Sequence, residues 1–145
     1  MAKIINNDIE QHAISAPYLL WQIALVGVAL GVIHWCLTAL IGRYIDSTSI
    51  SGDIATILVA TLGVLVMIRL HMAQPLIVAV ASGLALWGLA RWTSGLSWGE
   101  IVAWNALLYG LSYTLFSWIA RYTLVVPVLS SMALVIVLVR IATIL

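Results

Sequence analysis

The sequence predicts an all-α integral membrane protein, a polytopic helical bundle with five transmembrane helices. Hydrophobic residues make up 64% of the 145 residues and charged residues only 8%, whereas a soluble domain has roughly 25% charged residues. Long apolar segments also recur along the chain, with short polar segments between them. A chain with so few charges cannot cover a surface that faces water, so we expect the lipid bilayer to be its main solvent.

The chain divides into a polar N-terminal segment, residues 1–16, and a single transmembrane domain, residues 17–145. Asn7 and Glu10 have the spacing of a helix-capping box, which favours a short interfacial helix in the first segment. A frayed tail is the alternative. The charges in this segment, and the length of the apolar run after it, argue against a signal peptide.

Five apolar stretches are long enough to cross the membrane, because about 20 residues span a hydrocarbon core of about 30 Å. Pro17 and Pro75 suit the first turn of a helix, where the N–H that proline lacks has no partner. Ser97 and Glu100 form a capping-box pattern, and Asp53 is expected to cap the second helix. The predicted spans are about 17–41, 54–71, 75–92, 100–120 and 123–145.

The C-terminal part of the chain allows two interpretations. Arg121 and Tyr122 interrupt an apolar run, and Pro127 follows soon after them. At 1.5 Å per residue, residues 101–145 are too long for one span and about right for two. We therefore favour five spans over four spans with a re-entrant or interfacial C-terminal segment.

The positive charges do not choose an orientation in the membrane. Five spans place Lys3, Arg69 and Arg121 on the side of the N-terminus and the other three arginines on the opposite side. The positive-inside rule is therefore balanced. His71 and the terminal amine tilt the prediction toward a cytoplasmic N-terminus.

Three predicted helix ends share a small residue, an arginine and an aromatic residue. At a membrane–water interface the arginine extends to the headgroups and complements the helix C-terminus, and the aromatic ring lies in the interfacial belt. We interpret these pairs as ordinary interface anchors; an internal repeat is the alternative, but the match is short. The anchors are Arg43, Tyr44, Arg91, Trp92, Arg121 and Tyr122.

One face of the first span combines small residues with a histidine. Ala24, Gly27, Gly31, His34 and Thr38 follow helical spacing, and small residues let another helix approach closely. His34 must find a partner there, because an unmatched polar group in hydrocarbon costs several kcal/mol. The main interpretation is a hydrogen bond to a neighbouring helix. The alternatives are a proton-sensitive gate, a pore-lining group, or an axial ligand of a haem or chlorin-type macrocycle.

Two other spans carry polar or small residues on one face. Asn105 and Ser112 share a face of the fourth span with Tyr109. An asparagine between membrane helices contributes roughly 0.6–2 kcal/mol of association energy, and it can also line a pore. The third span is rich in small residues, and we expect Ala79 and Gly83 to support close helix packing.

Several classes of function are disfavoured by what the sequence lacks. No carboxylate lies in the middle of a predicted span, although ion-coupled transporters usually need one. The histidines are scattered and Cys36 is the only cysteine, so we predict no metal site and no cofactor. No nucleophile–base pair or phosphate-binding loop is present, and we therefore expect no enzyme and no catalytic residue. A net charge of +1 gives no indication of nucleic-acid binding.

Three functional hypotheses remain. The first is an accessory or structural subunit of a larger membrane complex, which binds other subunits or its own copies through the Gly27–Gly31 face and the third span. The second is a small channel or facilitator. The third is a haem- or chlorin-binding subunit that uses His34. The path of the second hypothesis would be lined by His34, Thr38, Asn105 and Ser112.

Overall fold

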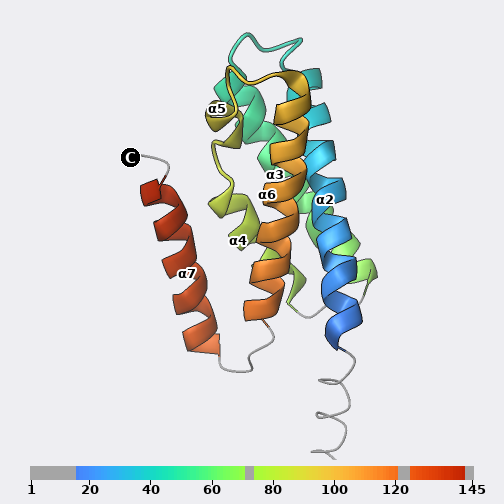
Figure 1. The fold of residues 1–145 in the computed structure, drawn as a ribbon, viewed down its shortest axis with the longest axis vertical. Coiled ribbons are helices and arrows are strands. Elements are labelled where there is room, and N and C mark those ends of the chain that lie inside the picture. Colours follow the sequence, from blue (N-terminus) through green and yellow to red (C-terminus); the bar gives the residue numbers. More distant parts are fainter. Residues whose placement is uncertain (1–15, 71–73, 121–124, 143–145) are drawn as a thin grey trace, which may run out of the picture.

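The computed structural model describes residues 16–70, 74–120 and 125–142, and every regular element in these ranges is a helix (Figure 1). The helices are α2 (Ala16–Ile41), α3 (Thr48–Arg69), α4 (Pro75–Ala85), α5 (Leu89–Trp92), α6 (Trp98–Ile119) and α7 (Val125–Ala142). The all-α class is confirmed. Three segments are long and apolar enough to cross a membrane, namely Leu20–Ile41, Thr48–Arg69 and Pro75–Trp92.

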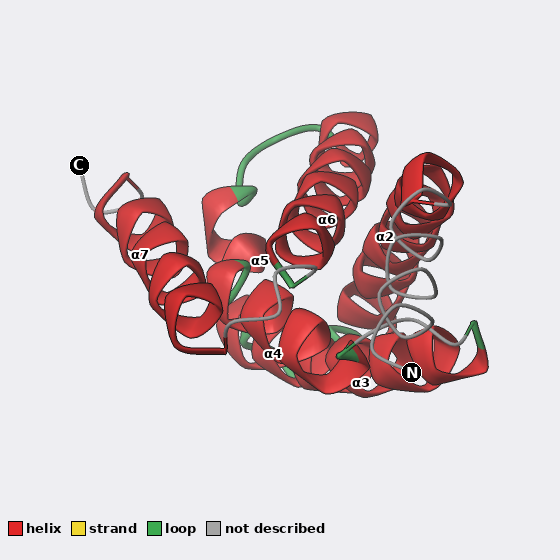
Figure 2. Cartoon of the chain, turned by 90° about the horizontal axis from the view of Figure 1, so that it is seen from below, coloured by secondary structure: helices red, strands yellow, loops and turns green. Residues whose placement is uncertain are grey.

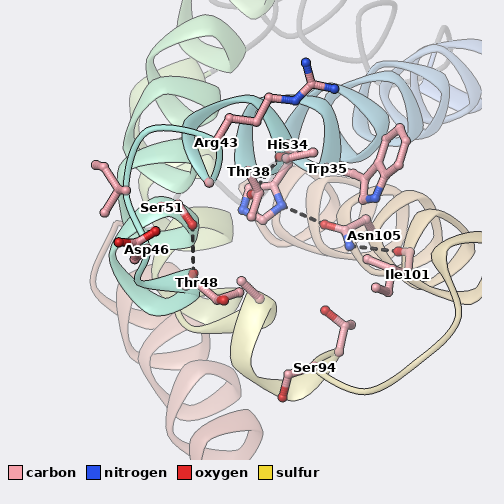
Figure 3. A pocket seen from close by; sticks show the side chains of 15 residues that line it. His34, Trp35, Thr38, Arg43, Asp46, Thr48, Ser51, Ser94, Ile101 and Asn105 are labelled. Atoms are coloured by element: carbon pink, nitrogen blue, oxygen red, sulfur yellow. Dashed lines mark hydrogen bonds between the residues drawn. The ribbon is translucent and has the colours of Figure 1, made fainter.

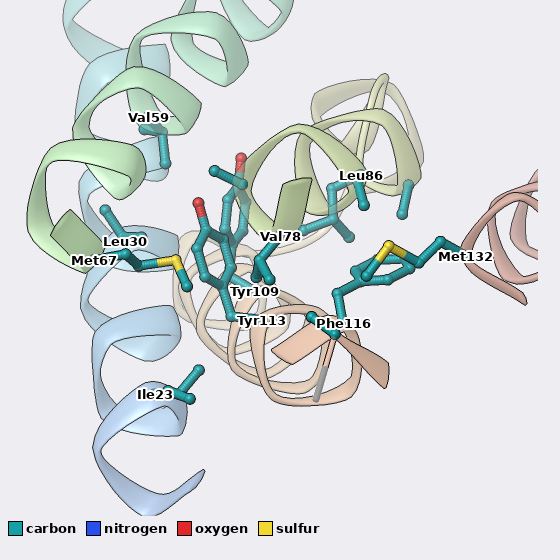
Figure 4. Close-up of a cluster of buried hydrophobic side chains, with 14 of the residues drawn as sticks. Ile23, Leu30, Val59, Met67, Val78, Leu86, Tyr109, Tyr113, Phe116 and Met132 are labelled. Atoms are coloured by element: carbon teal, nitrogen blue, oxygen red, sulfur yellow. The ribbon is translucent and has the colours of Figure 1, made fainter. Parts of the chain in front are cut away.

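Helices α2 and α6 lie side by side, and their chains run in opposite directions (Figures 1 and 2). Helix α3 packs on α2, and α4 packs between α3 and α6. Helix α7 packs mainly on α4 and leans away from α6 (Figure 2). The buried core gathers around three aromatic side chains of α6, which are Tyr109, Tyr113 and Phe116 (Figure 4).

Helix α6 has the same length as α3, 22 residues, but it is not among the three segments that are apolar enough to cross a membrane. Its inner face is polar. Leu107 and Leu111 point outward and are more than half exposed. In a membrane helix, apolar side chains face the lipid and polar side chains face the protein, because an unmatched polar group in hydrocarbon is costly. The buried polar residues of this inner face are Asn105, Tyr109, Ser112, Tyr113 and Ser117.

Two glycines of α2 allow the backbone of α6 to approach closely. A Cβ atom on Gly27 would lie 2.7 Å from the Tyr109 carbonyl oxygen, and one on Gly31 would lie 2.7 Å from the Asn105 carbonyl carbon. Both distances are shorter than real Cβ contacts. The small-residue face of the first span therefore packs against another helix of the same chain.

The second helix begins earlier than the sequence predicts. Helix α3 starts at Thr48 rather than near residue 54, and Ser47 caps it by accepting a hydrogen bond from the Ile50 N–H at 3.5 Å. The expectation that Asp53 caps this helix is therefore wrong. The hydroxyl of Ser51 donates to the Thr48 carbonyl at 3.1 Å, so a residue typical of loops is satisfied inside the helix.

The predicted third span is interrupted by a turn. Helix α4 ends at Ala85, and α5 begins only at Leu89 after Gly88, whose φ of 85° lies in the left-handed region that glycine favours. The side chain of Arg140 on α7 donates to the Leu84 carbonyl at 3.2 Å. The Leu84 carbonyl also accepts from the Trp87 N–H at 3.4 Å, so the arginine adds a cationic donor at the C-terminal end of α4.

The remaining boundaries agree more closely with the sequence. The capping box before α6 is confirmed, because Ser97 accepts from the Glu100 N–H and the Glu100 carboxylate accepts from the Ser97 N–H at 2.9 Å. Helix α7 runs over 125–142 within the predicted 123–145. The proposed interfacial helix of residues 1–16, apart from Ala16 at the start of α2, lies outside the described residues, as do Arg121 and Tyr122.

Candidate functional site

A buried hydrogen-bond network joins three helices through His34. Its Nδ1 lies 2.6 Å from Oδ1 of Asn105 on α6, and its Nε2 lies 3.1 Å from Oγ1 of Thr56 on α3. All three side chains are at most 2% exposed. The imidazole therefore has a polar partner on each of the two helices that pack against α2.

The partners of Asn105 fix the proton on one ring nitrogen of His34. The amide nitrogen of Asn105 donates to the Ile101 carbonyl at 2.8 Å, so its oxygen faces the imidazole. An amide oxygen only accepts, and Nδ1 must therefore carry a hydrogen. This assignment follows from the arrangement of donors and acceptors.

The other ring nitrogen shares its partner with a backbone carbonyl. Oγ1 of Thr56 lies 3.1 Å from Nε2 of His34 and 2.9 Å from the Gly52 carbonyl oxygen. A hydroxyl has one hydrogen. With a neutral ring, Thr56 donates to Nε2. With a doubly protonated ring, Nε2–H donates to Thr56, which in turn donates to Gly52. Rotation of one hydroxyl therefore accommodates both protonation states.

Two tyrosine rings of α6 pack beneath the imidazole. The ring centroid of Tyr109 lies 5.2 Å from that of His34, and the rings of Tyr109 and Tyr113 are stacked 6.4 Å apart. Both tyrosines are 1% exposed, and their hydroxyls have no hydrogen-bond partner among the described residues. The imidazole thus adjoins the ring of Tyr109, and Figure 4 shows Tyr109 and Tyr113 among the buried hydrophobic side chains.

A pocket of about 330 Å³ opens above this network, between the ends of α2, α3 and α6 (Figure 3). His34 and Asn105 lie at its inner end, and Arg43 and Asp46 belong to the loop that follows α2. Its volume is at the small end of the usual range for ligand pockets, roughly 300–1,000 Å³. The remaining polar lining residues are Trp35, Thr38, Thr48, Ser51, Thr93 and Ser94.

The interruption of the third span supplies one wall of this pocket. Helix α5 packs against α3, and Ala90 and Thr93 line the cavity. The approach is close because Gly52 has no side chain; a Cβ there would clash with the Cβ of Ala90. A continuous third helix would not turn at Gly88 to bring α5 to this place.

The structure brings together three of the four residues expected to line a path. His34, Thr38 and Asn105 meet at the pocket, whereas Ser112 is buried farther along α6 and does not line it. Sequence reasoning did not assign Thr56 to the site. Its position within a turn of Gly52 on α3 could have indicated a helix contact there.

The other predicted residues serve packing or lie at the surface. Ala79 is fully buried, and a Cβ on Gly83 would meet Ala60 at an ordinary 3.5 Å. Of the interface anchors, Arg43, Tyr44 and Arg91 are exposed and Trp92 is half-buried, all at the end of the bundle that holds the pocket.

Ligation of a haem iron by His34 would break part of this network, because both ring nitrogens already have protein partners. Within the part of the chain that the structure describes, no three His, Cys, Asp or Glu side chains gather in a metal-binding arrangement. No family model matches this chain, and neither the curated proteins nor the solved structures contain a significant match.

Proposed function

We propose that this protein is a multi-pass membrane facilitator that binds a small polar solute in the pocket above His34. The observation that carries this proposal is a pocket at one end of the bundle whose apolar lining also holds several polar side chains, closed inside by the His34–Asn105 pair. Polar groups inside membrane domains are rare, and they commonly mark a solute pathway. The non-enzymatic character remains part of the proposal.

The inner face of α6 supports a route for the solute beyond the pocket. Below Asn105 this face continues with hydroxyl groups that are buried and lack a partner among the described residues. Buried hydroxyls are usually hydrogen-bonded, so polar groups of this kind indicate contact with water or solute. The hydroxyls belong to Tyr109, Ser112, Tyr113 and Ser117.

The proposal includes five spans, with α6 and α7 as the fourth and fifth, and a cytoplasmic N-terminus. Substituted-cysteine labelling from either side of the membrane tests this topology. The experiment starts from the Cys36→Ser variant, because Cys36 is exposed and would react itself. Single cysteines in the 42–47 and 93–97 loops should label from the same side. Labelling of these two loops from opposite sides would contradict the proposed topology.

Flux into liposomes that contain only this protein tests the function. Stopped-flow swelling with a panel of small polar solutes should be faster than in empty liposomes. Ser94→Trp should block it, because the exposed Ser94 lines the pocket and an indole there would fill the cavity. Gly99→Trp is the matched control, since a Cβ at Gly99 meets nothing within 4 Å. Equal rates with and without protein would refute the proposal.

A subunit of a larger membrane complex is the second candidate, and two apolar grooves beside α4 favour it. One, of about 410 Å³, lies between α3 and α4, and the other, of about 310 Å³, lies between α4 and α7. The Gly27–Gly31 face is occupied by α6 and is not available to a partner. Blue-native electrophoresis after gentle solubilisation should show a larger assembly; a monomer alone would exclude this candidate.

A further inference from the structure

We propose that the pocket above His34 selects small primary amines in their ammonium form. This inference rests on the proposed function, because it names the solute class for the same pocket. Two observations support it. The lining hydroxyls direct their hydrogen atoms toward backbone carbonyls rather than into the pocket, and the carboxylate of Asp46 lies at the pocket's edge.

Four hydroxyls that line the pocket donate their only hydrogen to a backbone carbonyl of their own segment. The distance from the hydroxyl oxygen to the carbonyl oxygen is between 2.6 and 3.1 Å in each case. A hydroxyl whose hydrogen is committed can only accept from a ligand. The pairs are Thr38 with the His34 carbonyl, Ser51 with Thr48, Thr93 with Leu89, and Ser94 with Arg91.

The polar side chains at the inner end offer a solute few donors. Both ring nitrogens of His34 are engaged by Asn105 and Thr56. Asn105 gives one of its two amide hydrogens to the Ile101 carbonyl, which leaves one for a ligand. Among these six side chains, free acceptors therefore outnumber free donors, and a molecule that mainly donates hydrogen bonds is the better complement to them. The other donors of the lining belong to Trp35, Thr48 and Arg43.

The pocket has one basic and one acidic lining residue, Arg43 and Asp46, and their placement favours a cation beside the hydroxyls. Asp46 lines it, on the side of Ser51 and Thr48 (Figure 3). The guanidinium of Arg43 points away from these two hydroxyl residues (Figure 3). An ammonium group has three donors and no acceptor. It can therefore bind the hydroxyl oxygens and the carboxylate together, and charge-assisted hydrogen bonds are the stronger kind.

The rest of the lining sets the size and nature of the amine. Trp35, Ala39, Ile45, Ala90 and Ile101 contribute apolar surface to the same cavity. A short alkyl chain can pack on this surface while its ammonium group meets the hydroxyls. We therefore expect a small alkyl amine to bind better than the ammonium ion itself.

Isothermal titration of the purified full chain in detergent, with three solutes of similar size, tests this inference. n-Propylammonium should bind, whereas propionate and propionamide should bind at least about tenfold more weakly. Asp46→Asn should weaken propylammonium binding about tenfold. Glu100→Gln is the matched control: Glu100 is an exposed acid at the same end that does not line the pocket, and glutamine also suits a capping box.

A second variant separates hydrogen bonding from charge. Thr93→Val keeps the shape of the side chain and removes an acceptor, so the affinity for propylammonium should fall several-fold. Preferred binding of propionate or propionamide, or unchanged affinity in Asp46→Asn, would overturn the cation inference while leaving a solute-binding facilitator. Absence of binding by every solute, together with liposome flux equal to that of empty vesicles, would instead overturn the proposed function.

Discussion

Substituting alanine for Gly31 should destabilise the bundle, whereas the same change at Gly83 should not. A Cβ on Gly31 would lie 2.7 Å from the carbonyl carbon of Asn105 and 2.8 Å from Cα of Ala106. Both are backbone atoms of α6, and the Asn105 carbonyl oxygen would lie closer still. Helix α6 must therefore retreat by more than about 0.7 Å to reach ordinary contact at 3.4 Å. A Cβ on Gly83 would already meet Ala60 at 3.5 Å.

The magnitude follows from three contributions. Overpacking typically costs about 1–3 kcal/mol. Displacement of Asn105 would also weaken its hydrogen bond to His34, worth about 0.5–1.5 kcal/mol, whereas alanine is favoured over glycine within a helix by about 1 kcal/mol. Gly31→Ala should therefore lower the free energy of unfolding by about 1–3 kcal/mol. Gly83→Ala should leave it unchanged or raise it by up to about 1 kcal/mol.

Reversible unfolding in mixed micelles, followed by circular dichroism, measures both variants under the same conditions. The expected result is a lower midpoint of unfolding for Gly31→Ala and an equal or higher one for Gly83→Ala. A Gly31→Ala variant as stable as the unmodified protein would refute the close contact between α2 and α6. Equal destabilisation would refute the distinction that the structure makes between a backbone contact and an ordinary side-chain contact.

Three further predictions concern single hydrogen bonds. Asn105→Leu leaves Nδ1–H of His34 without its acceptor and should lower the free energy of unfolding by about 1–3 kcal/mol. Unchanged stability in the same micelle assay would contradict the hydrogen-bond network. Arg140→Met removes the donor to the Leu84 carbonyl, so spin labels on α4 and α7 should move apart; unchanged distances would exclude this bond as a tether. Ser97→Ala removes a helix cap and should lower stability by about 1 kcal/mol, measured by thermal unfolding.

The helical class could be predicted because composition alone rules out a surface that faces water. The helix boundaries are harder to predict, because at particular residues the hydropathy suggests one structure and the local backbone adopts another. Ser49 and Ser51 look like a loop in the sequence, yet both lie within α3, and the hydroxyl of Ser51 is satisfied by a carbonyl one turn back. Leu86 and Trp87 look like a continuous span, yet the chain turns there because Gly88 adopts a positive φ.

The site could be predicted in part. A lone histidine in an apolar span requires a polar partner, so the sequence alone indicates His34 as a site residue. Asn105 was also singled out from its own span. Their pairing depends on how α2 and α6 align, which Gly27 and Gly31 allow but do not specify. The sequence does not predict that Thr93 lines the pocket, because its position there depends on the turn at Gly88.

The inward polar face of α6 also bears on how the chain enters the membrane during synthesis. Alone in lipid, α6 would expose Asn105 and several hydroxyls to hydrocarbon, which is costly. Its partners α2, α3 and α4 precede it in the chain and are therefore made first. The order of the helices thus lets α6, with its polar inner face, insert beside neighbours that already offer it hydrogen bonds, rather than into lipid by itself.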